Sequence, residues 1–73
     1  MKNLAGMAEG ETARVAGLLS AGPMRRRLLD LGLIKGTRVE CLQKSPAGDP
    51  VAYGVRGAVI ALREEDAAKV LVI

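Results

Sequence analysis

The sequence lacks several residue types on which catalysis and metal binding often depend. It has no histidine, tryptophan or phenylalanine, and it has one cysteine, Cys41, and one tyrosine, Tyr53. A single cysteine cannot form an internal disulfide, and this usage is typical of a reducing compartment. Without histidine, a tight transition-metal site within one chain is not expected. We therefore expect no metal site and no cofactor.

Pairs of catalytic residues are missing as well. Most group-transfer enzymes place a nucleophile beside a base. Ser20 and Ser45 fall in expected loops with no base to pair with, and nothing near Cys41 would lower its pKa. No glycine pattern matches a phosphate-binding loop. We predict that the chain is not an enzyme.

Long hydrophobic runs and a large excess of one charge are also absent. No apolar run approaches the roughly 20 residues that span a bilayer, and no signal-peptide core follows Met1. Eleven basic and eight acidic residues leave a net charge of +3, and there is no aromatic platform for stacking bases. We expect a soluble cytoplasmic protein that binds no nucleic acid and reaches a membrane only through a partner.

Short strands account for most of what the sequence does contain. Its 73 residues are 49% hydrophobic, which predicts a single domain over residues 1–73 with an aliphatic core. Alternating residues predict five strands at 11–19, 38–44, 51–55, 58–62 and 69–73. Gly17 interrupts the first alternation and predicts a bulge, and Cys41 falls in phase with core positions. Five short strands at about ten-residue spacing favour an all-β fold with short helices, a small barrel closed or nearly closed.

Turns separate these strands, and residues 45–50 are the strongest of them. Two prolines, a glycine and Asp49 fall within six residues, and Asp49 is expected to accept a hydrogen bond from nearby backbone N–H groups. After the fourth strand, residues 63–68 predict a single helical turn. Its acidic residues 64–66 suit the positive end of a helix dipole and point in different directions, so they converge poorly on a cation.

Residues 22–33 carry the clearest helical signal in the chain. Pro23 suits the first helical position, and Gly32 suits the position just after the helix ends. At about 100° per residue, one face of this helix carries apolar side chains that we expect to seal the barrel: Met24, Leu28 and Leu31. Leu33 follows the glycine as the apolar residue that usually packs back on such a cap.

The other face of this helix is basic. It carries Arg25, Arg26 and Leu29, with Arg27 beside them. One interpretation is a solvated face on which Arg26 pairs with Asp30 four residues later. The other is a surface that docks on an acidic partner or on anionic lipid. We take as candidate partner-binding residues Arg25, Arg26, Arg27, Leu29 and Leu33.

The order of these parts resembles the FeoA family, small cytoplasmic proteins of bacterial ferrous iron uptake. The likeness rests on RLLDLGL at 27–33 and on residues 36–37, 46–50, 55–57, 61–63 and 67. It implies an SH3-like barrel with a helix inserted after the first strand. It also implies a non-enzymatic accessory or regulatory protein whose partner is the cytoplasmic region of a FeoB-type membrane transporter. We expect a monomer or a weak homo-oligomer.

Two other functions stay open from the sequence. The same fold forms the C-terminal domain of iron- and manganese-dependent repressors, which suggests a metal-responsive domain, although no helix-turn-helix precedes the barrel here. A small barrel with a basic helix is also compatible with nucleic-acid binding through phosphates. Proline-peptide binding of the usual SH3 kind is doubtful, because Tyr53 is the only aromatic residue.

Overall fold

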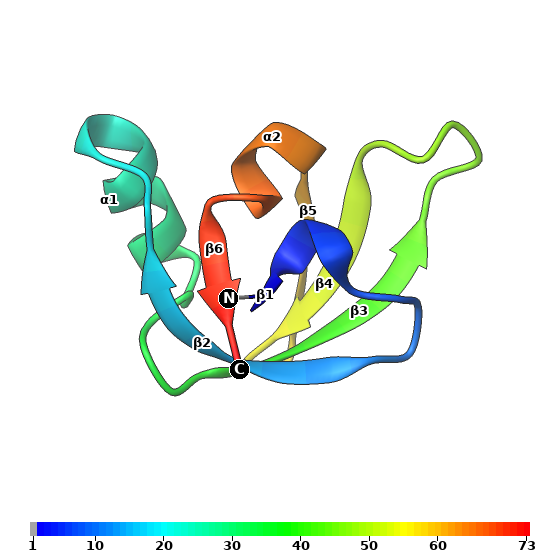
Figure 1. The fold of residues 1–73 in the computed structure, drawn as a ribbon, viewed down its shortest axis with the longest axis horizontal. Coiled ribbons are helices and arrows are strands. Elements are labelled where there is room, and N and C mark those ends of the chain that lie inside the picture. The colour runs from blue at the N-terminus through cyan, green and yellow to red at the C-terminus, as the bar shows by residue number, and fades with distance from the viewer. Residues whose placement is uncertain (1) are drawn as a thin grey trace.

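The computed structural model describes residues 2–73, and Figure 1 shows a strongly bent antiparallel sheet with two short helices. The order is β1 (Lys2–Asn3), a 3-10 turn η1 (Leu4–Gly6), β2 (Thr12–Leu18), α1 (Gly22–Asp30), β3 (Arg38–Lys44), β4 (Val51–Val55), β5 (Ala58–Leu62), α2 (Glu64–Ala67) and β6 (Val70–Val72). Neighbouring strands follow the order β1-β6-β2-β3-β4-β5 across the sheet. The predicted all-β barrel with a helix after the first long strand is confirmed.

Strand β2 makes the corner of the barrel. Its first half pairs with β3, where Thr12 lies opposite Glu40, and its second half pairs with β6, where Leu18 lies opposite Val70. The register shifts between Val15 and Gly17, as the broken alternation predicted. A bulge bends a strand and increases its twist, so β2 can belong to both halves of the sheet.

Local patterns predicted the strand positions closely. The bounds of β3, β4 and β5 agree with the prediction, and β2 and β6 are each one residue shorter at both ends. The sheet also contains one strand more than the five predicted, because Lys2 and Asn3 pair with Leu71 and Val72 of β6. Two residues are too few to show a period of two, so only pairing with a distant strand reveals β1.

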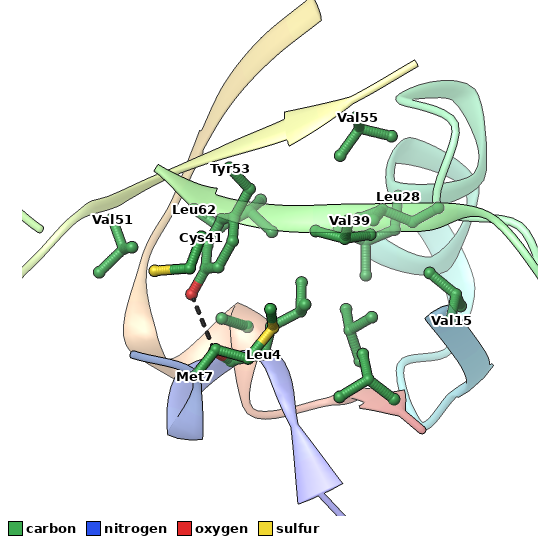
Figure 2. Packing of buried hydrophobic residues seen from close by; sticks show 14 residues of the cluster. Leu4, Met7, Val15, Leu28, Val39, Cys41, Val51, Tyr53, Val55 and Leu62 are labelled. Atoms are coloured by element: carbon green, nitrogen blue, oxygen red, sulfur yellow. Dashed lines mark hydrogen bonds between the residues drawn. The ribbon is translucent and has the colours of Figure 1, made fainter. Parts of the chain in front are cut away.

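The core lies inside the bend of the sheet, between β2–β6 and the outer strands. Val15, Val39 and Val55 point toward one another there, and Leu28 of α1 closes the same side (Figure 2). On the other side the Tyr53 hydroxyl donates a hydrogen bond of 3.2 Å to the carbonyl of Leu4. This bond fixes the 3-10 turn against β4 and satisfies a hydroxyl that is otherwise cut off from water.

The loop between β3 and β4 reaches farther than predicted. The Asp49 carboxylate accepts a hydrogen bond of 2.8 Å from the backbone N–H of Glu64, the first residue of α2. The expected bond within the loop is therefore replaced by one to a distant helix. Because the first N–H groups of a helix have no intrahelical partner, Asp49 serves as the missing cap of α2.

Candidate partner-binding surface

Helix α1 lies beside the barrel, and its inward stripe is as predicted. Leu28 is fully buried, and Met24 and Leu31 are partly buried against the core. Pro23 occupies the first turn, where its missing N–H costs nothing. In Figure 1 α1 lies at one end of the molecule, and on the face opposite this stripe Arg25 and Arg26 are exposed.

The end of α1 is fixed by a glycine in a left-handed conformation. Gly32 has φ +100°, and its N–H bonds the carbonyl of Leu29 at 3.0 Å. The N–H of Leu33 bonds the carbonyl of Leu28 at 3.1 Å. These two bonds form the Schellman arrangement, which satisfies carbonyls at the helix end. A Cβ on Gly32 would lie 3.2 Å from Cδ of Arg56, so the end of α1 also packs on the turn between β4 and β5.

Leu33 is not available as a contact residue, contrary to the sequence-based expectation. Its side chain is fully buried in the core together with Leu28. The turn at Gly32 directs Leu33 inward, where it makes the apolar contact that accompanies a Schellman cap. Only its predicted role in packing back on the cap agrees with the structure.

The other four candidate residues lie on or near the outer face of α1. Arg25, Arg26 and Arg27 are exposed, and Leu29 is half-buried. The Arg25 guanidinium makes a long contact of 3.5 Å with the carbonyl of Leu18 at the end of β2. Arg27 faces a cleft between α1 and α2 that is also lined by Glu65 and Asp66. The arginines thus diverge, and Arg25 and Arg26 stay with Leu29 as the outward group.

The expected ion pair between Arg26 and Asp30 is not formed. Within residues 2–73 the one ion pair joins Lys2 and Glu11, far from α1 along the chain. An exposed pair four residues apart on a helix gains only a few tenths of a kcal/mol, which is offset by ordering two side chains. The cations of α1 therefore have no acidic partner among the described residues.

Two exposed apolar residues flank α1 and were not predicted. The Leu19 side chain is 64% exposed just before the helix, and the Ile34 side chain is 42% exposed just after it. From the sequence, Leu19 is the last residue of a predicted strand, and Ile34 lies in the loop after the predicted helix. Only their exposure in the folded structure distinguishes them, because this exposure depends on the path of the chain after β2 and after Gly32.

The polar and titratable groups inside the fold offer little chemistry. Burial raises the pKa of the Cys41 thiol above its ordinary value, so the thiol stays protonated at neutral pH. Across residues 2–73 no three side chains of the Cys, Asp and Glu type gather closely enough to hold a metal ion. Nor does any helix in that part of the chain have the length and apolar character needed to cross a membrane.

Comparison with known proteins identifies the family. The model of the FeoA domain matches residues 2–73. The chain belongs to the FeoA family. This family is linked to ferrous iron transport, and the barrel with its inserted helix is the fold of its solved members.

Individual relatives agree with this assignment. The chain is 34% identical over 61 residues to a Fe(2+) transport protein A/Fe(2+) transporter FeoB fusion protein of Porphyromonas gingivalis; the match covers 84% of this chain and 7% of that protein. The FeoA protein of Chlorobium tepidum is 31% identical, with a TM-score of 0.91 over 97% of this chain and 68% of that one. The FeoA of Stenotrophomonas maltophilia, an SH3 domain protein complexed with zinc, is 31% identical, with a TM-score of 0.88 over 100% and 91% of the two chains.

Repressors share the fold of these FeoA proteins. A manganese-dependent transcriptional repressor superimposes with a TM-score of 0.86 over 99% of this chain and 40% of that protein, at 22% identity. At this identity the likeness concerns the fold alone. The metal-responsive alternative therefore gains no support beyond architecture.

Proposed function

We propose that this protein is a non-enzymatic accessory component of bacterial ferrous iron uptake that docks on the cytoplasmic part of a FeoB-type transporter. The observation that carries the proposal is the relative in which a FeoA-type protein and the transporter FeoB are fused. Two proteins that are joined in one organism commonly act at one place in another. The proposal puts this chain in the cytoplasm, where the transporter's cytoplasmic region is accessible.

The surface that we assign to docking is the outer face of α1. Arg25 and Arg26 are exposed cations without an acidic partner in the described chain, and Leu29 is half-buried on the same face of the helix. Arg27 borders this surface on the side of α2. An apolar residue rimmed by arginines is typical of protein interfaces, in which arginine is enriched and lysine depleted. An acidic patch on the transporter is the complementary surface.

Calorimetric titration of the whole chain with the cytoplasmic region of its transporter tests this proposal. We expect the double variant Arg25→Glu/Arg26→Glu to bind at least about tenfold more weakly, because two charge contacts become repulsive. Leu29→Glu combined with Arg26→Glu should bind more weakly still. Lys69→Glu, an exposed charge reversal outside α1, is the matched control and should bind like the unmodified chain.

The outcomes separate the function from the surface. If the unmodified chain does not bind the transporter region, the proposed function is wrong. If it binds and both α1 variants bind equally well, docking occurs elsewhere on the molecule. Circular dichroism of each variant ensures that a loss of binding reflects the surface and not a loss of α1.

A further inference from the structure

We propose that the outer face of strands β2 to β5 is a second binding site, which takes an acidic, extended peptide segment. The site is a groove of about 770 Å³ that runs across the sheet from Arg14 on β2 to Val59 on β5. None of its residues belongs to the α1 surface. The proposal therefore stands independently of docking on a transporter.

Cations from four separate parts of the chain line this groove. Arg14 and Arg38 lie directly opposite each other on β2 and β3. Lys35 comes from the loop after α1, and Arg56 comes from the turn between β4 and β5. Like charges at paired positions destabilise a sheet, and in residues 2–73 none of these four forms an ion pair. Glu40 is the one acidic residue in the groove. An anionic occupant would relieve this repulsion.

Backbone contacts hold the Arg14 side chain and the loop that carries Lys35. The Arg14 guanidinium donates a hydrogen bond of 2.9 Å to the carbonyl of Gly36. The loop that carries Lys35 is tied to β2 by two backbone bonds, from Gly36 to the Val15 carbonyl at 2.7 Å and from Val15 to the Thr37 carbonyl at 2.9 Å. Less side-chain freedom is lost on binding when the contact residues are already positioned.

Arg56 occupies a backbone position that its residue type rarely takes. Its φ is +52°, in the left-handed region, and it is the one residue other than glycine in this region among those described. Glycine would suit this turn better, because most L side chains are strained there by about 1 kcal/mol or more, and asparagine or aspartate would be tolerated through local hydrogen bonds. A strained residue in the wall of a groove is a recurring feature of functional sites.

The floor of the groove is apolar and is shaped by a glycine. Gly54 lies between Glu40 and Val59 in one row across the sheet. A side chain on Gly54 would meet Leu42, whose Cδ1 lies 3.4 Å from the position that a Cβ would take. The Leu42 and Val59 side chains are 38% and 69% exposed. Gly54 therefore leaves room for Leu42 to pack over it, and the Leu42 and Val59 side chains provide apolar contact area.

These features favour a peptide over the other anionic partners. Nucleic acid is bound through phosphates together with aromatic stacking, and the groove has no aromatic residue. Glu40 would repel a continuous run of phosphates, whereas a peptide can place an apolar side chain there. A second copy of this chain would bring its own cations against the same row. An acidic segment interleaved with apolar residues matches both the cations and the floor.

Fluorescence anisotropy with a labelled peptide of about ten residues, built of glutamate and valine, tests the site. We expect binding that weakens about tenfold or more in Arg14→Glu/Arg38→Glu and when NaCl is raised from about 50 to about 500 mM. Lys69→Glu is the matched control and should bind as the unmodified chain does. A peptide with glutamine in place of glutamate should not bind.

Amide chemical shifts measured during the titration locate the peptide. We expect the largest shifts at Arg38, Gly54 and Val59, with α1 unchanged. Largest shifts on α1, equal binding of the glutamine peptide, or unchanged binding by the Arg14→Glu/Arg38→Glu variant would each overturn the proposal. An oligonucleotide that binds this face more tightly than the glutamate peptide would overturn it in favour of nucleic acid.

Discussion

Tyr53 is the single aromatic residue in a core that is otherwise aliphatic. Its ring lies among aliphatic side chains, and its hydroxyl points to the carbonyl of Leu4 (Figure 2). Burial is the main cause that raises the pKa of Tyr53 to about 12, and nearby groups that carry negative charge when ionised, those of Cys41, Asp49 and Glu64, add to it. Tyr53 thus packs the core, holds the 3-10 turn and has a hydroxyl with a raised pKa.

This shift predicts a loss of stability at high pH. Folded Tyr53 keeps its proton until about pH 12, whereas an unfolded tyrosine loses it near pH 10. Between these values the unfolded state binds fewer protons, so the free energy of unfolding falls as pH rises, by roughly 2 to 3 kcal/mol in all. Urea unfolding of the unmodified chain and of Tyr53→Phe at several pH values isolates this contribution.

The single tyrosine also makes the control direct. Tyrosinate absorbance reports Tyr53 alone, because the chain has no other tyrosine and no tryptophan. Tyr53 in the folded protein should titrate near pH 12. In Tyr53→Phe the free energy of unfolding should lack this fall between pH 10 and pH 12. A tyrosinate signal that rises near pH 10 in the folded state would contradict the prediction.

Alternation along a strand predicts which side chains point inward, and it was right for Cys41 because a strand has only two faces. Leu33 shows where this reasoning stops. It follows a helix and precedes a strand, so no period applies to it. Its burial is decided by the left-handed turn at Gly32 and by the position of the core beyond that turn.

The elements themselves were predictable wherever a local pattern is bounded by turn residues. Strands β3, β4 and β5 satisfy both conditions, and their bounds agree with the prediction. The basic groove was not predictable, because it depends on register. Arg14 and Arg38 look like unrelated surface residues until β2 and β3 pair and place them opposite each other. A single sequence gives the residues of each strand but not their partners.

Helix α2 is the element that depends most on a distant residue. It has only four residues, and no side chain at its own N-cap position, Arg63, accepts a hydrogen bond. Asp49 supplies that bond from the loop between β3 and β4. A helix this short is not stable by itself in water, so its cap and its buried Ala67 hold it in place.

We predict that Asp49→Ala loosens α2 and costs about 1 kcal/mol of unfolding free energy, because the Glu64 N–H loses its acceptor. Hydrogen exchange at residues 64–67 should accelerate more than exchange in β3. Asp49→Asn is the matched control, since it keeps an acceptor oxygen and removes a charge beside Glu64 and Glu65. We expect Asp49→Asn to lose less unfolding free energy than Asp49→Ala, relative to the unmodified chain. Equal loss in both variants would show that the cap is unimportant.

At the scale of the whole molecule, the net charge of +3 conceals a division of charge. One basic surface lies on α1, a second lies in the groove across β2 to β5, and an acidic group lies at the start of α2. The three arise from different elements, so none is visible in the total. Exposed charges act mainly within a Debye length of about 10 Å, so a partner responds to the charge of the surface that it contacts and not to the net charge of the chain.

Strand β5 is an edge of the sheet, because it pairs with β4 and with no other strand in the described part of the chain. Its sequence, Ala-Val-Ile-Ala-Leu, contains no charge and no proline, the usual means by which proteins protect edges. Val59 on this strand is 69% exposed. An edge of this kind is able to pair with the same edge of a second copy.

We therefore predict weak, concentration-dependent self-association, which Val59→Lys reduces about tenfold because a charge on an edge strand opposes pairing. Sedimentation velocity over a concentration series measures it. Leu19→Lys is the matched control, since Leu19 is 64% exposed but lies outside the strands, and it should associate like the unmodified chain. If Leu19→Lys reduces association and Val59→Lys does not, copies meet near α1 and not at β5.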